Sequence, residues 1–178
     1  DEMVKLTKLV GAIFGWEYNS CEVAIDKETL YPVDFCNAVP DSSFMSLHFY
    51  FPWIIKALIR WTTFCSVTGR KFRFDLNWQK YLDVASTEIS YEEKLDKYME
   101  IADQYFENEK FEEFCAKHLS HLDEVAYDFF TSEEMNKIIE RKIRKKFPEH
   151  EFDEFTAHYK GIRDFWAKCE YDKLKATV

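Results

Sequence analysis

Apolar residues recur every three or four positions through most of the chain, and this spacing predicts helices. The first such stretch runs from Asp1 to about Phe14, and Gly15 follows it as a typical helix-ending residue. From about Pro52 onward the helical spacing continues almost to the end of the chain. The last helix, opened by Pro148, has its apolar seam at Phe152, Phe155, Tyr159, Ile162, Trp166 and Cys169.

Capping residues predict where the later helices begin. Asn77 is expected to cap a short helix, and Ser90 with Glu93 three positions later forms a capping box. Thr131 and Glu134 form a second capping box. The expected helices after residue 50 cover about 52–67, 77–84, a stretch from residue 90, 110–130, 131–146 and a stretch from residue 148.

Two short segments between the first helix and Pro52 predict a β-hairpin, with strands at about Ser20–Ile25 and Tyr31–Cys36 and a polar link at 26–29. If Glu22 lies opposite Asp34, three facing pairs on one face of the sheet are apolar, as a half-buried hairpin requires. These apolar pairs are Cys21 with Phe35, Val23 with Val33, and Ile25 with Tyr31.

This register places two carboxylates side by side, and their like charges oppose each other. A divalent cation such as Mg²⁺ relieves that repulsion, because it binds carboxylate and amide oxygens together with phosphates. Asn37 supplies a third ligand if the second strand ends or bulges at Cys36 or Asn37. The alternative is that Glu22 and Asp34 face solvent without a ligand.

The segment from Gly15 to Asp41 resembles the last part of an ATP-grasp domain of the glutathione-synthase-like kind. The resemblance is carried by an acidic residue, a hairpin, the run Asp34-Phe35-Cys36-Asn37, and a loop containing Pro40. It covers about residues 3 to 60. Relative to the common Glu-x-Asn pattern of that superfamily, the run in this chain is one residue longer. The resemblance implies that Glu22, Asp34 and Asn37 hold Mg²⁺ against the phosphates of ATP.

The resemblance also implies a longer parent protein, since the adenine pocket and the phosphate-binding lysines of an ATP-grasp domain precede this segment. We therefore expect residues 1–65 to be the C-terminal segment of an ATP-grasp-like domain and 66–178 to be a helical extension. The parent would be an Mg²⁺-dependent ligase that activates a small carboxylate substrate with ATP as an acyl phosphate. This chain alone, without the upstream subdomains, is expected to be inactive. The alternative is a non-catalytic helical protein-interaction domain.

Composition supports a folded chain and narrows its class. Only 4 Gly and 4 Pro among 178 residues favour long helices, so the expected fold class is α+β, predominantly α. A net charge of −9 argues against nucleic acid and anionic membranes as partners. The most apolar stretch, Phe44 to Val67, contains His48, Lys56 and Arg60 and is expected to be a buried element rather than a membrane span. Five scattered cysteines favour reduced thiols and a cytoplasmic location.

Other side-chain groups are better explained by packing than by chemistry. His118, His121 and Glu124 have helical spacing, but an apolar stripe runs through the same stretch, and Glu154 with His158 lacks the further ligands of a metal site. Cys36 is expected to be a packed thiol. The basic run 141–146 suits a helix C-terminus. The aromatic stretch 44–61 is either core, an interface, or both.

Overall fold

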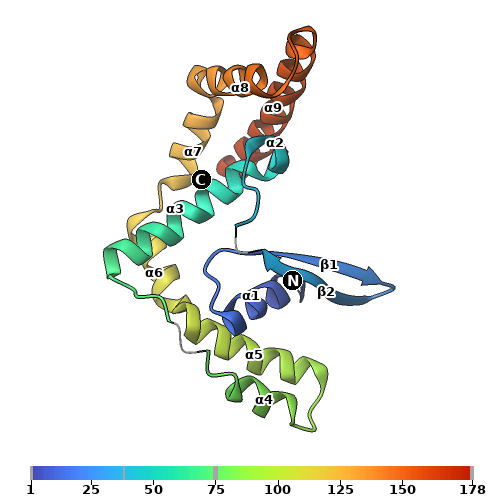
Figure 1. The fold of residues 1–178 in the computed structure, drawn as a ribbon. Helices are drawn as coiled ribbons and strands as arrows, with labels where there is room; N and C mark the ends of the chain where they lie inside the picture. Colours follow the sequence, from blue (N-terminus) through green and yellow to red (C-terminus); the bar gives the residue numbers. More distant parts are fainter. Residues whose placement is uncertain (1, 38, 74–75, 177–178) are drawn as a thin grey trace. The chain divides into compact units, whose positions relative to one another are not determined.

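A computed structural model describes residues 2–37, 39–73 and 76–176 and has an α+β, mainly helical fold with one antiparallel hairpin (Figure 1). The expected fold class is therefore confirmed. The helices and strands are α1 (Glu2–Phe14), β1 (Ser20–Asp26), β2 (Thr29–Asn37), α2 (Phe44–Leu47), the 3₁₀ turn η1 (His48–Tyr50), α3 (Phe51–Thr68), α4 (Gln79–Ala85), α5 (Tyr91–Phe106), α6 (Asn108–His118), α7 (Leu122–Thr131), α8 (Glu133–Lys146), the 3₁₀ turn η2 (Glu149–Glu151) and α9 (Phe152–Ala176).

The chain forms two compact units, and each is built from two separate stretches of sequence. Unit 1 comprises Asp1–Pro40 and Phe64–Phe114, and unit 2 comprises Asp41–Thr63 and Cys115–Val178. The chain thus leaves unit 1 after the hairpin and re-enters it within α3. The proposed division of the chain near residue 65 concerns the origin of the two segments and stays a prediction.

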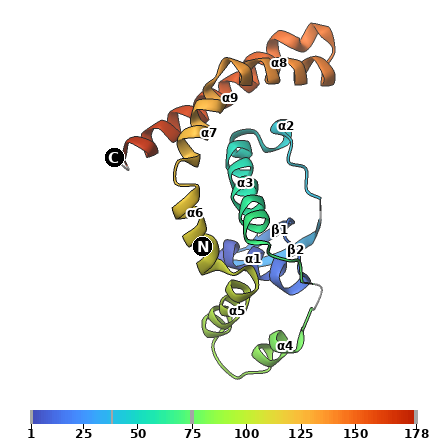
Figure 2. The same ribbon diagram turned by 90° about the vertical axis from the view of Figure 1, so that its left-hand side faces the viewer.

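In unit 1, α1 packs on α5, and α4 also packs on α5 (Figure 2). The centre of this packing is apolar and formed by Ala12, Ala102 and Tyr105, with Met99 and Phe106 around them. The hairpin contacts α1 at its base, while its turn end extends past α1 (Figure 1). Unit 1 therefore holds the hairpin from one side only.

Two helices end with the same glycine motif, which fixes the direction of the chain beyond them. Gly15 and Gly69 both have positive φ, at 66° and 67°. In each case the residue after the glycine donates its N–H to a carbonyl five residues back, Trp16 to Gly11 at 2.8 Å and Arg70 to Cys65 at 3.1 Å. This is the Schellman arrangement, in which glycine avoids the cost of a left-handed conformation. The role predicted for Gly15 is confirmed.

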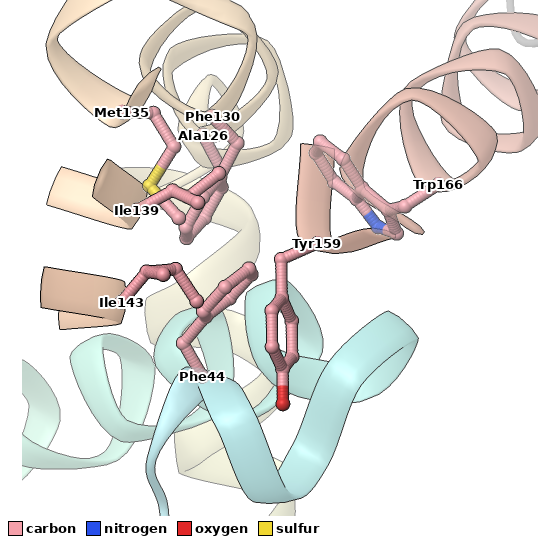
Figure 3. Close-up of a cluster of buried hydrophobic side chains, with 8 residues drawn as sticks. All are labelled: Phe44, Ala126, Phe130, Met135, Ile139, Ile143, Tyr159 and Trp166. Carbon is pink, nitrogen blue, oxygen red and sulfur yellow. The ribbon is translucent and has the colours of Figure 1, made fainter. Parts of the chain in front are cut away.

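Unit 2 has the larger apolar core, in which side chains from α2, α7, α8 and α9 converge (Figure 3). Met135, Ile139 and Ile143 repeat every four residues along α8 and are almost completely buried. The ring of Phe44 lies 5.2 Å from that of Tyr159, and Phe130 lies 5.5 Å from Trp166. The seam predicted for the last helix is confirmed at five of its six positions, because Tyr159 and Trp166 are buried and Phe152, Phe155 and Ile162 are partly buried against the same core.

The helix boundaries confirm some capping predictions and correct others. The Ser90–Glu93 capping box is present at the start of α5. The N-cap of α8 is Ser132, whose side chain accepts from the Met135 amide, so the box predicted at Thr131 is wrong by one residue. The N-cap of α4 is Trp78 rather than Asn77.

The helix expected over 110–130 is two helices. α6 ends at His118 and α7 begins at Leu122, with a short link closed by the Leu122 amide donating to the Leu119 carbonyl at 3.0 Å. Phe44 to Val67, the most apolar stretch, forms α2, η1 and most of α3. None of the described helices combines the length and apolar composition that a bilayer crossing requires.

Candidate functional site

The β1–β2 hairpin closes through a two-residue turn, Lys27-Glu28. Lys27 has φ 57°, the left-handed conformation that tight hairpin turns require. The turn sets the first four facing pairs, which run from Asp26 opposite Thr29 to Val23 opposite Pro32. Continued unchanged, this register would place Glu22 opposite Val33.

A β-bulge changes the register at that point. Glu22 lies opposite Asp34, so Val33 is an extra residue on β2 between the pairs Val23–Pro32 and Glu22–Asp34. A second irregularity follows, and Ser20 lies opposite Asn37. The two carboxylate-bearing residues are therefore cross-strand neighbours, as the sequence predicted, but they reach that position through a bulge.

The apolar pairs predicted beside them are wrong. Val23 faces Pro32 instead of Val33, and Ile25 faces Leu30 instead of Tyr31. The reason is that the predicted pairs require an odd number of residues in the turn, whereas the Lys27-Glu28 turn has two, so each of these β1 residues faces a residue one position earlier on β2. Ile25, Tyr31 and Val33 are exposed, with relative accessibilities of 62%, 49% and 60%.

Glu22 and Asp34 are both exposed, whereas their neighbours Cys21, Val23 and Phe35 are half-buried. Burial raises the pKa of the Cys21 thiol, and the negative charge of Asp34 raises it further. The field of Asp34 thus extends across the strand pair to Cys21. Because the carboxylates of Glu22 and Asp34 are exposed, a cation can reach them from solvent.

Asn37 is the last residue of β2, and its role as a third ligand stays a prediction. The side chains of Cys36 and Asn37 lie outside the part of the chain that the structure describes. Asp41, which closes the motif that resembles the ATP-grasp ending, has a structural contact in unit 2. It accepts hydrogen bonds from the Ser43 amide at 2.9 Å and from the Ser46 hydroxyl, and these bonds lower its pKa.

Aromatic rings hold the base of the hairpin to the end of α1. Phe14 stacks on Trp16 at 4.6 Å and on Phe35 of β2 at 5.9 Å. Trp78 meets Phe14 edge-on at 6.3 Å and donates its indole N–H to the Ile13 carbonyl at 2.9 Å. These contacts fix the end of β2 that carries Asp34.

The α1–β1 connection is held by a buried charged cluster of Glu17, Arg70, Tyr105 and Glu107, which we call the Arg70 cluster. Arg70 Nη1 donates to Glu17 Oε1 at 2.8 Å, and Tyr105 Oη donates to the same oxygen at 3.0 Å. Arg70 Nη2 donates to the Tyr105 carbonyl at 3.0 Å, and Nε lies 3.6 Å from Glu107. The side chains of Arg70 and Glu17 are only 3% and 11% exposed.

The pKa values of the cluster follow from this geometry. Burial opposes the charge of Arg70, but hydrogen bonding to Glu17 and its negative charge outweigh that effect and raise the pKa of Arg70. Burial, followed by the charge of Glu17, raises the pKa of Tyr105 to about 12. The cluster thus pairs the Glu17 carboxylate with the Arg70 guanidinium at 2.8 Å and fixes the segment that leads into β1.

Sequence reasoning did not find the Arg70 cluster, because its members come from positions 17, 70, 105 and 107 and share no local spacing. One signal was present. Gly15 and Gly69 each precede a charged residue by one or two positions, and both glycines end helices. Two helix stops that deliver opposite charges into loops are a reason to test for an ion pair.

The other groups singled out from the sequence are dispersed by the fold. His118 ends α6 and His121 precedes α7, so the two do not share one helix. Glu154 and His158 lie on α9, where the His158 ring approaches His48 at 6.4 Å. The basic run occupies the last turns of α8, as predicted. Within the described residues, no group of three or more His, Cys, Asp or Glu side chains is arranged to hold a metal.

Comparisons with protein-family models, with curated proteins and with solved structures gave no match. The functional case therefore depends on the residues of the hairpin themselves.

Proposed function

We propose that this chain is the C-terminal part of an ATP-grasp-type carboxylate ligase, and that Glu22 and Asp34 contribute to its Mg²⁺ site. The observation that carries the proposal is the bulge at Val33, which makes the two acidic residues cross-strand neighbours. Without it, the two-residue turn would separate them. Bulges are frequent next to functional sites, where they redirect a side chain.

The donor set fits the proposed ion. Mg²⁺ is usually bound by one or two carboxylates and keeps several waters or phosphate oxygens in its shell. Glu22 and Asp34 supply two exposed carboxylates. Asn37 is proposed as the third protein ligand. In the parent, the ion would neutralise charge on the phosphates of ATP.

The hairpin also has the surface of an unfinished sheet. A two-stranded sheet is marginally stable on its own, and exposed strand edges invite further pairing. The exposed Ile25, Tyr31 and Val33 give this hairpin apolar area that nothing in the described residues covers. We propose that upstream subdomains of the parent chain cover it, in a cytoplasmic protein whose substrate is a small carboxylate.

The roles of the chain's own residues follow from the contacts. Phe14 and Trp78 hold the base of the hairpin, the Arg70 cluster holds the α1–β1 connection, and the bulge brings the carboxylates together. Binding of the cation would remove the repulsion between Glu22 and Asp34 that the free hairpin has to tolerate.

A titration with Mn²⁺, used as a paramagnetic substitute for Mg²⁺, tests the metal site on the 178-residue chain. We expect broadening of the amide NMR signals of Cys21–Val23 and Val33–Phe35, with a dissociation constant of about 1 mM for two carboxylates. Asp34→Asn should abolish this broadening. Asp26→Asn is the matched control, because it removes the same charge from the same hairpin at the turn end, opposite Thr29.

Broadening that is centred away from the hairpin, or that survives Asp34→Asn, would contradict the metal assignment. In the full-length parent, the same substitution should reduce ATP-dependent ligation by about 100-fold or more, measured as ADP release with a panel of carboxylates and amines. Unchanged ADP release in Asp34→Asn would reject the ligase proposal even if the isolated chain binds the ion.

The second candidate is a non-catalytic helical interaction domain, and one observation favours it. Tyr50 and Trp53 on the aromatic stretch 44–61 are 67% and 62% exposed, and large exposed aromatic side chains are frequent at interfaces. Absence of metal binding at the hairpin, together with an inactive parent, would leave this candidate as the better explanation.

A further inference from the structure

Unit 2 contains a pocket of about 400 Å³ on the surface of α3, which is within the size range of small-molecule sites. Its walls come from η1, α3, α7 and α9. Half of the lining is aromatic or apolar and half is charged; the lining residues are Phe49, Tyr50, Trp53, Lys56, Ala57, Arg60, Asp123, Trp166, Glu170 and Lys173.

The charges of the pocket are largely paired at its buried end. Lys56 Nζ lies 2.5 Å from Glu170 Oε1 and 2.8 Å from Asp123 Oδ1. The side chains of Lys56 and Glu170 are only 14% and 9% exposed. Burial opposes the charge of Lys56, but its bonds to the two carboxylates outweigh that effect and raise its pKa. Lys56 therefore stays protonated and is already satisfied by protein groups.

Arg60 is different, because the fold does not satisfy it. Its Nη2 is 3.6 Å from Asp123 Oδ2, beyond hydrogen-bond distance, and its Nε is buried without a partner among the described residues. Lys173 lies 3.5 Å from Glu170 at the exposed rim. Three cations and two carboxylates line the pocket, so it has a surplus of one positive charge, and the Arg60 side chain is 40% exposed. Its terminal guanidinium nitrogens, rather than the buried Nε, are the donors that a ligand in the pocket can reach.

The aromatic lining adds a second kind of recognition. Among the lining rings, Trp53 and Tyr50 are 62% and 67% exposed, while Trp166 is 4% exposed. The exposed surface of rings of this size is unfavourable in water, and covering it with a planar apolar group is favourable. A cation beside aromatic surface is complementary to a ligand that has one negative charge and one ring.

We propose that this pocket binds a small aromatic carboxylate, whose carboxylate accepts from Arg60 and whose ring contacts Trp53. The inference is independent of the metal site on the hairpin, since it uses residues of unit 2 only. The negative charges of Asp123 and Glu170 disfavour the binding of dianions, and the surplus positive charge of the pocket disfavours the binding of cations.

Three probes with the same ring and different charge test this on the 178-residue chain: phenylacetate, 2-phenylethanol and 2-phenylethylammonium. Binding is followed at pH 7 through the indole N–H signals of the tryptophans in a proton–nitrogen NMR spectrum. We expect phenylacetate to shift the Trp53 and Trp166 signals and to bind at least about tenfold more tightly than the alcohol. Trp16 and Trp78, in unit 1, are internal references and should not shift.

Two variants separate the charge from the ring. Arg60→Gln should remove the preference for phenylacetate over 2-phenylethanol, and Arg141→Gln, an exposed residue of α8 outside the pocket, should leave it unchanged. Trp53→Ala should weaken the binding of phenylacetate and of 2-phenylethanol by a similar factor. Both Arg60 and Trp53 are exposed enough that the fold should tolerate the changes.

Several results would overturn the proposal. The ammonium probe could bind as tightly as phenylacetate or more tightly, or the signals of Trp16 or Trp78 could shift as much as that of Trp53. No probe could bind at a concentration of about 10 mM. The preference for phenylacetate could also persist in Arg60→Gln.

Discussion

Replacing Arg70 by Met tests whether the Arg70 cluster holds the loop that leads into the hairpin. The substitution leaves the Glu17 carboxylate 11% exposed without its cation, and only the Tyr105 hydroxyl still donates to it at 3.0 Å. Removing one partner of a buried pair costs about 3–5 kcal/mol, because the other charge stays buried. We expect about 3 kcal/mol here, since Tyr105 and rearrangement of Glu17 offset part of the loss.

The assay is thermal unfolding by calorimetry, together with urea denaturation. A loss of about 3 kcal/mol lowers the midpoint by about 6–12 °C for a chain of this length. Lys110→Met is the control, because Lys110 pairs with Glu107 of the same cluster but is 73% exposed. An exposed pair of this kind is worth about 0.5 kcal/mol or less, so the midpoint should move by no more than about 2 °C.

A double variant separates the ion pair from simple packing. Glu17→Met with Arg70→Met replaces both charges by apolar groups and should be within about 1 kcal/mol of the natural chain. A cost below about 1 kcal/mol for Arg70→Met alone would refute the reasoning. So would a double variant that loses the sum of the two single effects, because the charges would then not depend on each other.

Three further predictions concern stability. Gly15→Ala should lower the free energy of unfolding in urea by about 1–2 kcal/mol, because its φ is +66° and the new Cβ would lie 3.2 Å from Leu76 Cδ2. Gly161→Ala, in open space on α9, is the control and should raise the free energy of unfolding by about 1 kcal/mol. Equal effects of the two substitutions would exclude this explanation. Ile139→Ala should cost about 3 kcal/mol, since Ile139 is 0% exposed at the centre of unit 2, and a loss below about 1 kcal/mol would mean that the core is not packed there. Tyr105 has its pKa raised to about 12 from the ordinary 10.0, so the folded state keeps a proton that the unfolded state loses. Stability present below pH 10 should therefore fall between pH 10 and 12, and urea midpoints of Tyr105→Phe should fall less over that range; identical pH profiles would contradict this.

The facing of Glu22 and Asp34 was predicted from a register that keeps charged and apolar residues on separate faces. The pair is present, but from Val23 to the turn the strands have a different register, so the structure reaches the pair in another way. That way could not be predicted. It depends on Lys27 adopting a left-handed conformation that Gly, Asn or Asp would have signalled, and on a bulge that has no residue signature at Val33. The predicted apolar pairs failed for this reason.

Helices were predicted well where their signals are local. The Ser90–Glu93 box and the stop at Gly15 are properties of a few adjacent residues. The break between α6 and α7 falls at Leu119, Ser120 and His121 and contains neither Gly nor Pro, so no local residue signals it. The Arg70 cluster and the pocket beside Arg60 combine residues from distant segments, so no local spacing in the sequence predicts them.

The division of each unit between two stretches of sequence has a consequence during synthesis. Phe44 belongs to a core whose other members begin at Ala126 and extend to Trp166. At about 5–20 residues per second, roughly 6–25 s pass between the synthesis of Phe44 and that of Trp166. During this interval the aromatic stretch 44–61 has none of its later partners, and the nascent chain presents it to the surroundings. We therefore expect chaperones to bind this stretch while the later part of the chain is being synthesised.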